Sequence, residues 1–157
     1  LDAWNPSFDG AVRALAVKGS TLYVGGNFTA VGSAARNRCA AFTPAAWVLS
    51  EFNPDVNGEV DAIVVTSSAI YIGGSFTTAG GASRNRLAAL DPSAGSALPW
   101  NAGVTGAAVY ALAASSDGSV IYAGGDFTAI GGKSCSYMAA LNASDGAALA
   151  WNPSSET

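Results

Sequence analysis

Leu22-Tyr23-Val24-Gly25-Gly26-Asn27-Phe28-Thr29 is the first of three closely similar octapeptides in this chain. The second is Ile70-Tyr71-Ile72-Gly73-Gly74-Ser75-Phe76-Thr77, and the third is Ile121-Tyr122-Ala123-Gly124-Gly125-Asp126-Phe127-Thr128. The first glycine of each pair falls at position 25, 73 or 124, in steps of 48 and 51 residues. This period predicts a repeat architecture, in which each unit buries its apolar face only against its neighbours.

A second marker has a matching period. Trp4-Asn5-Pro6 has copies that begin at Phe52, Trp100 and Trp151, in steps of 48, 48 and 51 residues. Because both markers recur once per unit, we expect their residues to be structural. They are Gly25, Gly26, Phe28, Gly73, Gly74, Phe76, Gly124, Gly125, Phe127, Trp4, Trp100 and Trp151.

The second unit indicates what each repeat forms. Residues 60–65 and 69–72 predict a hairpin around the polar pair Ser67-Ser68, and residues 84–90 predict a third strand. After a turn at residues 91–95, residues 97–100 predict a short outer strand, whose Pro99 is tolerated only at a sheet edge. Four antiparallel strands in about 50 residues are typical of a propeller blade. A β-solenoid is the less favoured alternative, because its coils are usually shorter.

The predicted fold is therefore an all-β propeller with three four-stranded antiparallel blades. We assign residues 11–54, 55–101 and 102–157 to the blades, and residues 1–10 to the outer strand of a preceding blade and a linker. Propellers close with about four to eight blades, so we expect these three to be part of a larger closed ring. They would be a segment of a longer array, or two copies of the chain would complete a six-bladed ring.

Composition excludes several function classes. The net charge is −4, and the seven basic residues are scattered, so no basic surface for nucleic acid is expected. No apolar run approaches the ~20 residues of a membrane-spanning helix. The chain has no histidine, the commonest general base and metal ligand. We therefore expect no enzyme activity, no cofactor and no metal.

The best metal candidate is a weak one. Asp55, Asn57 and Glu59 alternate oxygen ligands as Ca²⁺ prefers, but they lack a complete calcium-binding loop. Aspartates beside glycine in turns more often bond to their own backbone. We favour that interpretation for Asp55, and equally for Asp9, Asp117 and Asp145.

Two other residue types have both a binding and a structural interpretation. Arg36, Arg38, Arg84 and Arg86 have donors suited to carboxylates or sulfated sugars, or they lock adjoining blades together. Trp4, Trp100 and Trp151 could stack on sugars, or they pack between blades. We favour the structural interpretation of both sets, because they recur in each repeat.

Two asparagines and two cysteines add smaller predictions. Asn27 and Asn142 match the pattern of N-glycosylation sites. Cys39 falls at an apolar strand position and is expected to be a buried thiol. A bridge to Cys135 would require the first and third repeats to meet.

The repeat resembles the delta-60 repeat family, and its paired glycines at a strand end are shared with kelch-like propellers. The resemblance rests on residues 60–65, 70–77 and 84–90 and on Trp100-Asn101, and it extends over nearly the whole chain. It implies a β-propeller and an extracellular or cell-surface location, and it brings no catalytic residues. The third repeat departs from the pattern, with Cys135-Ser136-Tyr137 in place of Arg-Asn-Arg.

These observations favour a noncatalytic structural or interaction module of an extracellular or cell-surface protein or assembly. Its partners would be proteins or further copies of the chain. The alternative is a lectin-like, carbohydrate-binding propeller that uses the inter-blade tryptophans and arginines, with a glycan as ligand. A binding site would lie in the repeat that departs from its siblings, at residues 133–137.

Overall fold

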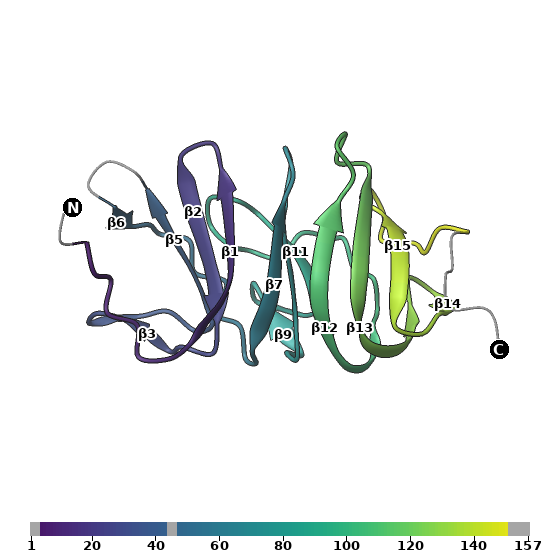
Figure 1. Cartoon of the computed structure of the whole chain (residues 1–157), viewed down its shortest axis with the longest axis horizontal. Helices are drawn as coiled ribbons and strands as arrows, with labels where there is room; N and C mark the ends of the chain where they lie inside the picture. Colours follow the sequence, from purple (N-terminus) through teal and green to yellow (C-terminus); the bar gives the residue numbers. More distant parts are fainter. Residues whose placement is uncertain (1–3, 44–46, 151–157) are drawn as a thin grey trace.

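The computed structural model describes residues 4–43 and 47–150. Within these ranges every regular element is a β-strand and there is no helix, so no helix there could cross a membrane (Figure 1). The all-β prediction is confirmed. Leu1-Asp2-Ala3 and Trp151, to which the sequence assigned roles, lie outside the described residues.

The first repeat forms a four-stranded antiparallel sheet. Its strands are β1 (Val12–Lys18), β2 (Thr21–Gly26), β5 (Cys39–Thr43) and β6 (Val48–Leu49), in that order. A small hairpin of β3 (Ala30–Val31) and β4 (Ala34–Ala35) joins β2 to β5. This repeat therefore has the predicted strand number.

The second and third repeats reuse this order. The second sheet has β7 (Val60–Val65), β8 (Ile70–Gly74) and β11 (Leu87–Leu90), with a hairpin of β9 (Thr78–Ala79) and β10 (Ala82–Ser83). The third has β12 (Thr105–Ala114), β13 (Val120–Ile130) and β15 (Met138–Asn142), and β14 (Lys133–Ser134) pairs with the end of β13.

The predicted fourth strand at residues 97–100 is wrong for the second repeat. Only Ala97 bridges to Leu90, so the sheet has three strands. The amide of Ala97 donates instead to Gly80 O in the β9–β10 turn, and Pro99 has no amide hydrogen. In the third repeat Ala148 likewise makes a single bridge, to Leu141.

The three sheets stand side by side in a row, with the first and third at opposite ends (Figure 1). The first strands β1, β7 and β12 are neighbours along one edge of the row. The main apolar cores lie between successive sheets. One contains Tyr23 and Cys39 of the first repeat with Val60 and Ile72 of the second, and the next repeats the arrangement. This stacking is expected of propeller repeats, whereas the number of blades, ring closure and the predicted boundaries stay predictions.

The paired glycines permit close packing and have no positive φ. A Cβ on Gly25 would lie 2.6 Å from Val60 Cγ1 of the next sheet, and one on Gly73 would lie 2.8 Å from Val109 Cγ1. A Cβ on the second glycine, Gly74, would overlap the carbonyl oxygen of Glu59 in its own sheet. The first glycine of the pair therefore allows sheets to stack, and the second allows the first two strands to pair.

Candidate functional site

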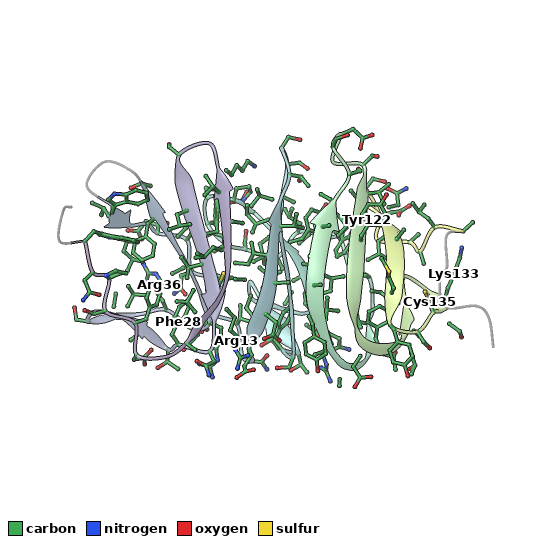
Figure 2. The ribbon with its side chains drawn as sticks, in the orientation of Figure 1. Arg13, Phe28, Arg36, Tyr122, Lys133 and Cys135 are labelled. Atoms are coloured by element: carbon green, nitrogen blue, oxygen red, sulfur yellow. The ribbon has the colours of Figure 1, made fainter. Side chains whose placement is uncertain are left out.

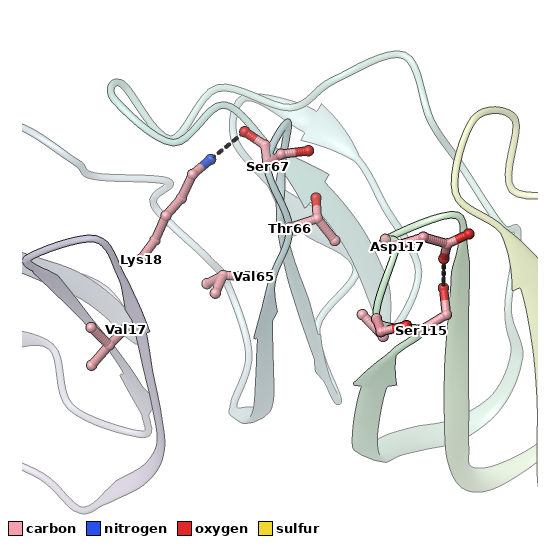
Figure 3. Close-up of a pocket in the computed structure, with 10 residues that line it drawn as sticks. Val17, Lys18, Val65, Thr66, Ser67, Ser115 and Asp117 are labelled. Carbon is pink, nitrogen blue, oxygen red and sulfur yellow. Dashed lines mark hydrogen bonds between the residues drawn. The ribbon is translucent and has the colours of Figure 1, made fainter.

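A groove lies along one side of the row, where the first and second strands of every repeat turn. We call this the hairpin end. The groove has a volume of about 370 Å³ (Figure 3). It is lined by Val17, Lys18, Val65, Thr66, Ser67, Ala114, Ser115, Ser116, Asp117 and Gly118, which come from all three repeats. The stacking of the first strands brings these turns together.

Local hydrogen bonds hold the groove walls. Lys18 Nζ in the first repeat donates to Ser67 O in the second, at 2.7 Å. Thr66 Oγ1 accepts from the amide of Ala69 at 3.1 Å, which closes the β7–β8 turn. Figure 3 shows Lys18 and Asp117 on opposite sides of the groove. The walls are thus preformed by contacts within and between repeats.

Asp117 supplies a fixed negative charge at the groove. Its carboxylate accepts from Ser115 Oγ at 2.5 Å and from the amide of Ser119 at 3.1 Å. These hydrogen bonds, led by that of Ser115, lower the pKa of Asp117 to about 2. The groove therefore has an anionic acceptor, an ammonium group and several hydroxyls, which suits hydrogen bonding to a peptide or a polyol. Among the described residues no group of three His, Cys, Asp or Glu side chains could hold a metal.

The calcium candidates lie near the opposite end, and each binds a different partner. Asp55 Oδ1 accepts from Asn37 Nδ2 at 2.6 Å. Asn57 Oδ1 accepts from the amides of Thr77 and Thr78, both at 2.9 Å. Glu59 Oε1 accepts from Arg13 and from Asn27 Nδ2. These three side chains therefore connect strands and loops of the protein.

Asp9 holds the same place in the first repeat as Asn57 in the second. It accepts from the amides of Thr29 and Ala30 at 2.7 and 2.9 Å and from Thr29 Oγ1 at 2.5 Å. The Thr29 hydroxyl and the two amides lower the pKa of Asp9 to about 2. The carboxylate anchors the loop that follows β2.

Asp9→Asn should make the chain less sensitive to acid. Because the pKa of Asp9 is lowered from 3.8 to about 2, its stabilising effect is present above pH 3.8 and lost as the pH falls toward 2. Asn57 shows that an amide can make the same bonds, since its Nδ2 donates to Thr77 Oγ1 at 2.8 Å. Thermal unfolding followed by circular dichroism should show a smaller loss of Tm from pH 4 to pH 2 in the variant. Asp9→Ala is the control, with a lower Tm at neutral pH, and equal acid sensitivity of wild type and Asp9→Asn would contradict the prediction.

The arginines are used within the protein. Arg36 Nη2 donates to Ser50 O at 2.8 Å, and Arg84 Nη2 donates to Leu98 O at 2.6 Å, each within its own repeat. Arg86 Nη1 donates to Phe76 O at 3.2 Å, and its Nε reaches Ala107 O of the third repeat at 2.8 Å. The lock between adjoining repeats is therefore present at Arg86. Arg38 Nη1 donates to Phe28 O within the first repeat.

The aromatic marker packs between repeats. Trp100 is only 6% exposed, its ring meets Tyr71 edge to face at 5.1 Å, and its Nε1 donates to Asn142 O of the third repeat at 3.0 Å. Phe52 packs on Tyr23 in the same way. Trp4 contacts Phe42 and remains 40% exposed. The face of Trp100 is therefore not open to a sugar.

The glycosylation candidates both make hydrogen bonds. Asn27 Oδ1 accepts from the amide of Ala11 at 2.7 Å, and Asn142 Oδ1 accepts from the amide of Ser144 at 2.9 Å. Glycosylation of either stays a prediction.

The two cysteines are thiols in different inter-sheet cores. Burial raises the pKa of Cys39 to about 12. Cys135 Sγ donates to Met138 O at 3.1 Å. The two cysteines form no bridge within one copy of the chain, and Cys39 is the buried thiol expected.

Residues 133–137, the segment favoured for binding, lie outside the groove, and Figure 2 shows Lys133 and Cys135 at the end of the row formed by the third repeat. Lys133 and Ser134 are exposed on β14, and Tyr137 is 67% exposed with a φ of 68°. Arg38 and Arg86 have a similar positive φ at this position, so Tyr137 keeps the backbone of the repeat and changes only the side chain.

Sequence reasoning missed the groove, because turn residues such as Thr66 and Ser115 have no motif of their own. It considered Asp117, but only as a turn residue. A signal was available. The turn after each first strand recurs with the repeat, and stacked repeats place equivalent turns side by side.

Comparison with known proteins supports the architecture. A family model described as a domain of unknown function (DUF5122) beta-propeller matches residues 69–97 and 115–148, in the second and third repeats. The second and third repeats are therefore similar to repeats of the β-propeller type. No curated protein matches the chain.

Proposed function

We propose that this chain is a noncatalytic structural and interaction module, with protein partners bound at the groove of the hairpin end. The observation that carries the proposal is the construction of the groove from the turns of three successive repeats. Loops that a rigid β-scaffold holds in place are common binding positions, because their side chains vary without disturbing the core.

The chemistry of the groove favours a peptide segment. Its volume of about 370 Å³ is at the lower end of ligand pockets and accommodates a few side chains or a short backbone stretch. Lys18 and Asp117 offer one charge of each sign, and Thr66 and Ser67 lie between them (Figure 3). Ser116 also lines the groove. Such a mixture can pair with backbone amides and carbonyls of an extended segment.

The residues considered for glycan binding are already engaged, which weakens the carbohydrate-binding alternative. Arg84 and Arg86 donate to backbone carbonyls, and Trp100 is buried against Tyr71. An extracellular or cell-surface setting is part of the proposal and rests on the resemblance to the delta-60 repeats.

A site-specific photocrosslinking experiment tests the proposed function. The chain would have a photoreactive residue at Ser116 in the groove or, as matched control, at the exposed Ser75 beyond β8 at the opposite end. In the source cells and their medium, Ser116 should give a discrete protein adduct that Ser75 does not give. Lys18→Glu should reduce this adduct about tenfold, as expected when a charge-assisted hydrogen bond is lost. Identical adducts at both positions, or a glycan adduct at Ser116, would contradict the proposal.

A further inference from the structure

The third sheet has an exposed apolar face that points away from the second sheet. We call it the Met138 face and define it as Ala111, Ala113, Gly124 and Met138. A hollow of about 310 Å³ lies on it, lined by these four residues together with Leu112, Tyr122 and Ala123. Its lining is almost entirely apolar.

The same face is covered in the first two sheets. Strand register makes Cys39 and Leu87 the equivalents of Met138, since each lies opposite the first glycine of its pair. Cys39 and Leu87 are 0% exposed, whereas Met138 is 41% exposed. The difference arises because a following sheet covers the first two faces.

The covering element is known in detail, because it occurs twice in the chain. Val60 of β7 enters the space above Gly25, where a Cβ would lie 2.6 Å from Val60 Cγ1 and 3.0 Å from Ile63 Cδ1. Val109 of β12 enters the space above Gly73. At Gly124 no described residue fills this space, since the nearest of their atoms to a Cβ is Ala111 Cβ of its own sheet at 3.7 Å.

The element that would fill this space is exposed on the first sheet. By register, Val12 is the equivalent of Val60 and Val109, and Leu15 is the equivalent of Ile63. Val12 is 40% exposed and Leu15 is 63% exposed, whereas Val60 and Val109 are 0% exposed. Val12 and Leu15 form what we call the Leu15 face.

We infer that the Met138 face of one copy binds the Leu15 face of a second copy. Val12 of the second copy occupies the space above Gly124, as Val60 does above Gly25, and Leu15 packs beside it as Ile63 does. The contact is heterologous, because two different faces meet. Two copies that make it reciprocally contribute six sheets, within the range of about four to eight that closed propellers have.

This inference is independent of the proposed function. The two faces lie at the ends of the row, whereas the groove lies across the first-strand turns. Ser116→Arg, which alters only the groove, should therefore leave the association unchanged.

Light scattering after size-exclusion chromatography tests the association. The wild-type chain, purified at micromolar concentration, should have twice its monomer mass of 15.5 kDa. Gly124→Arg should have the monomer mass with an unchanged circular dichroism spectrum, because the monomer has room for a Cβ there. Leu15→Arg should behave in the same way at the other face, and Ser116→Arg should keep the doubled mass.

Mixing the two monomeric variants tests which faces meet. Gly124→Arg retains an intact Leu15 face, and Leu15→Arg retains an intact Met138 face. The mixture should therefore form a 1:1 complex that neither variant forms alone. A monomeric wild type, a doubled mass of Gly124→Arg, or a mixture that stays monomeric would overturn the inference.

Discussion

Gly74→Ala should destabilise the chain by at least about 3 kcal/mol, at the upper end of the effect of overpacking. The new Cβ would overlap the carbonyl oxygen of Glu59, which accepts from the amide of Ser75 at 3.0 Å. Backbone cannot rotate away as a side chain can, so the pairing of β7 with β8 must open. Because small domains have only about 5–15 kcal/mol of stability, this loss would be a large share of the total. Urea denaturation monitored by circular dichroism measures the loss.

Gly124→Ala is the matched control for this prediction. Gly124 also lies in a second strand, but a Cβ there meets no atom of residues 4–43 and 47–150 closer than 3.7 Å. Its free energy of unfolding should change by no more than about 1 kcal/mol and could rise, because glycine weakens strand interiors. Both variants would be made in the Leu15→Arg background, which excludes any effect on self-association. Equal denaturation midpoints for the two variants would show that the overlap at Gly74 is relieved cheaply.

Trp100→Ala should cost about 3–5 kcal/mol of stability, the usual cost of removing a buried large aromatic side chain. The change removes the edge-to-face contact with Tyr71 and the hydrogen bond to Asn142 O, which connect the second and third repeats. Trp100→Phe should lose only about 1 kcal/mol, the value of one hydrogen bond, because Phe52 fills the equivalent position on Tyr23. Thermal and urea unfolding of the three proteins would give this order.

The exposed Trp47 is the control for aromatic content. It is 42% exposed, so Trp47→Ala should change stability by less than about 1 kcal/mol. A stable Trp100→Ala protein that loses binding on a glycan array would contradict the packing role and support the carbohydrate-binding alternative.

Local sequence was sufficient to predict the repeat and most of the strands. The period of the glycine pairs, the β-branched run at residues 60–65 and the turn at residues 91–95 depend on short-range chemistry, which a single repeat displays. The prediction of an outer strand at residues 97–100 failed because neighbouring amides donate to different segments. The amide of Ala97 donates to Gly80 O, and the amide of Leu98 donates to Ala89 O. Local propensity does not reveal that competition.

Individual site residues were harder to interpret. The sequence presented Arg86 and Trp100 with two roles each, and the structure engages them in contacts to the third repeat. Their partners are backbone carbonyls, which have no sequence signature, so only the folded chain could identify them.

The sequence by itself predicted the repeat, the strand order within each unit and the need for neighbouring units. Each of these depends on periodic patterns of glycine, aromatic and β-branched residues. Only the tertiary structure could bring Lys18, Thr66 and Asp117 to one groove, and only it could reveal that Met138 and Leu15 are exposed. These features depend on how whole sheets stack, and stacking joins residues about 50 or more positions apart that no local pattern connects.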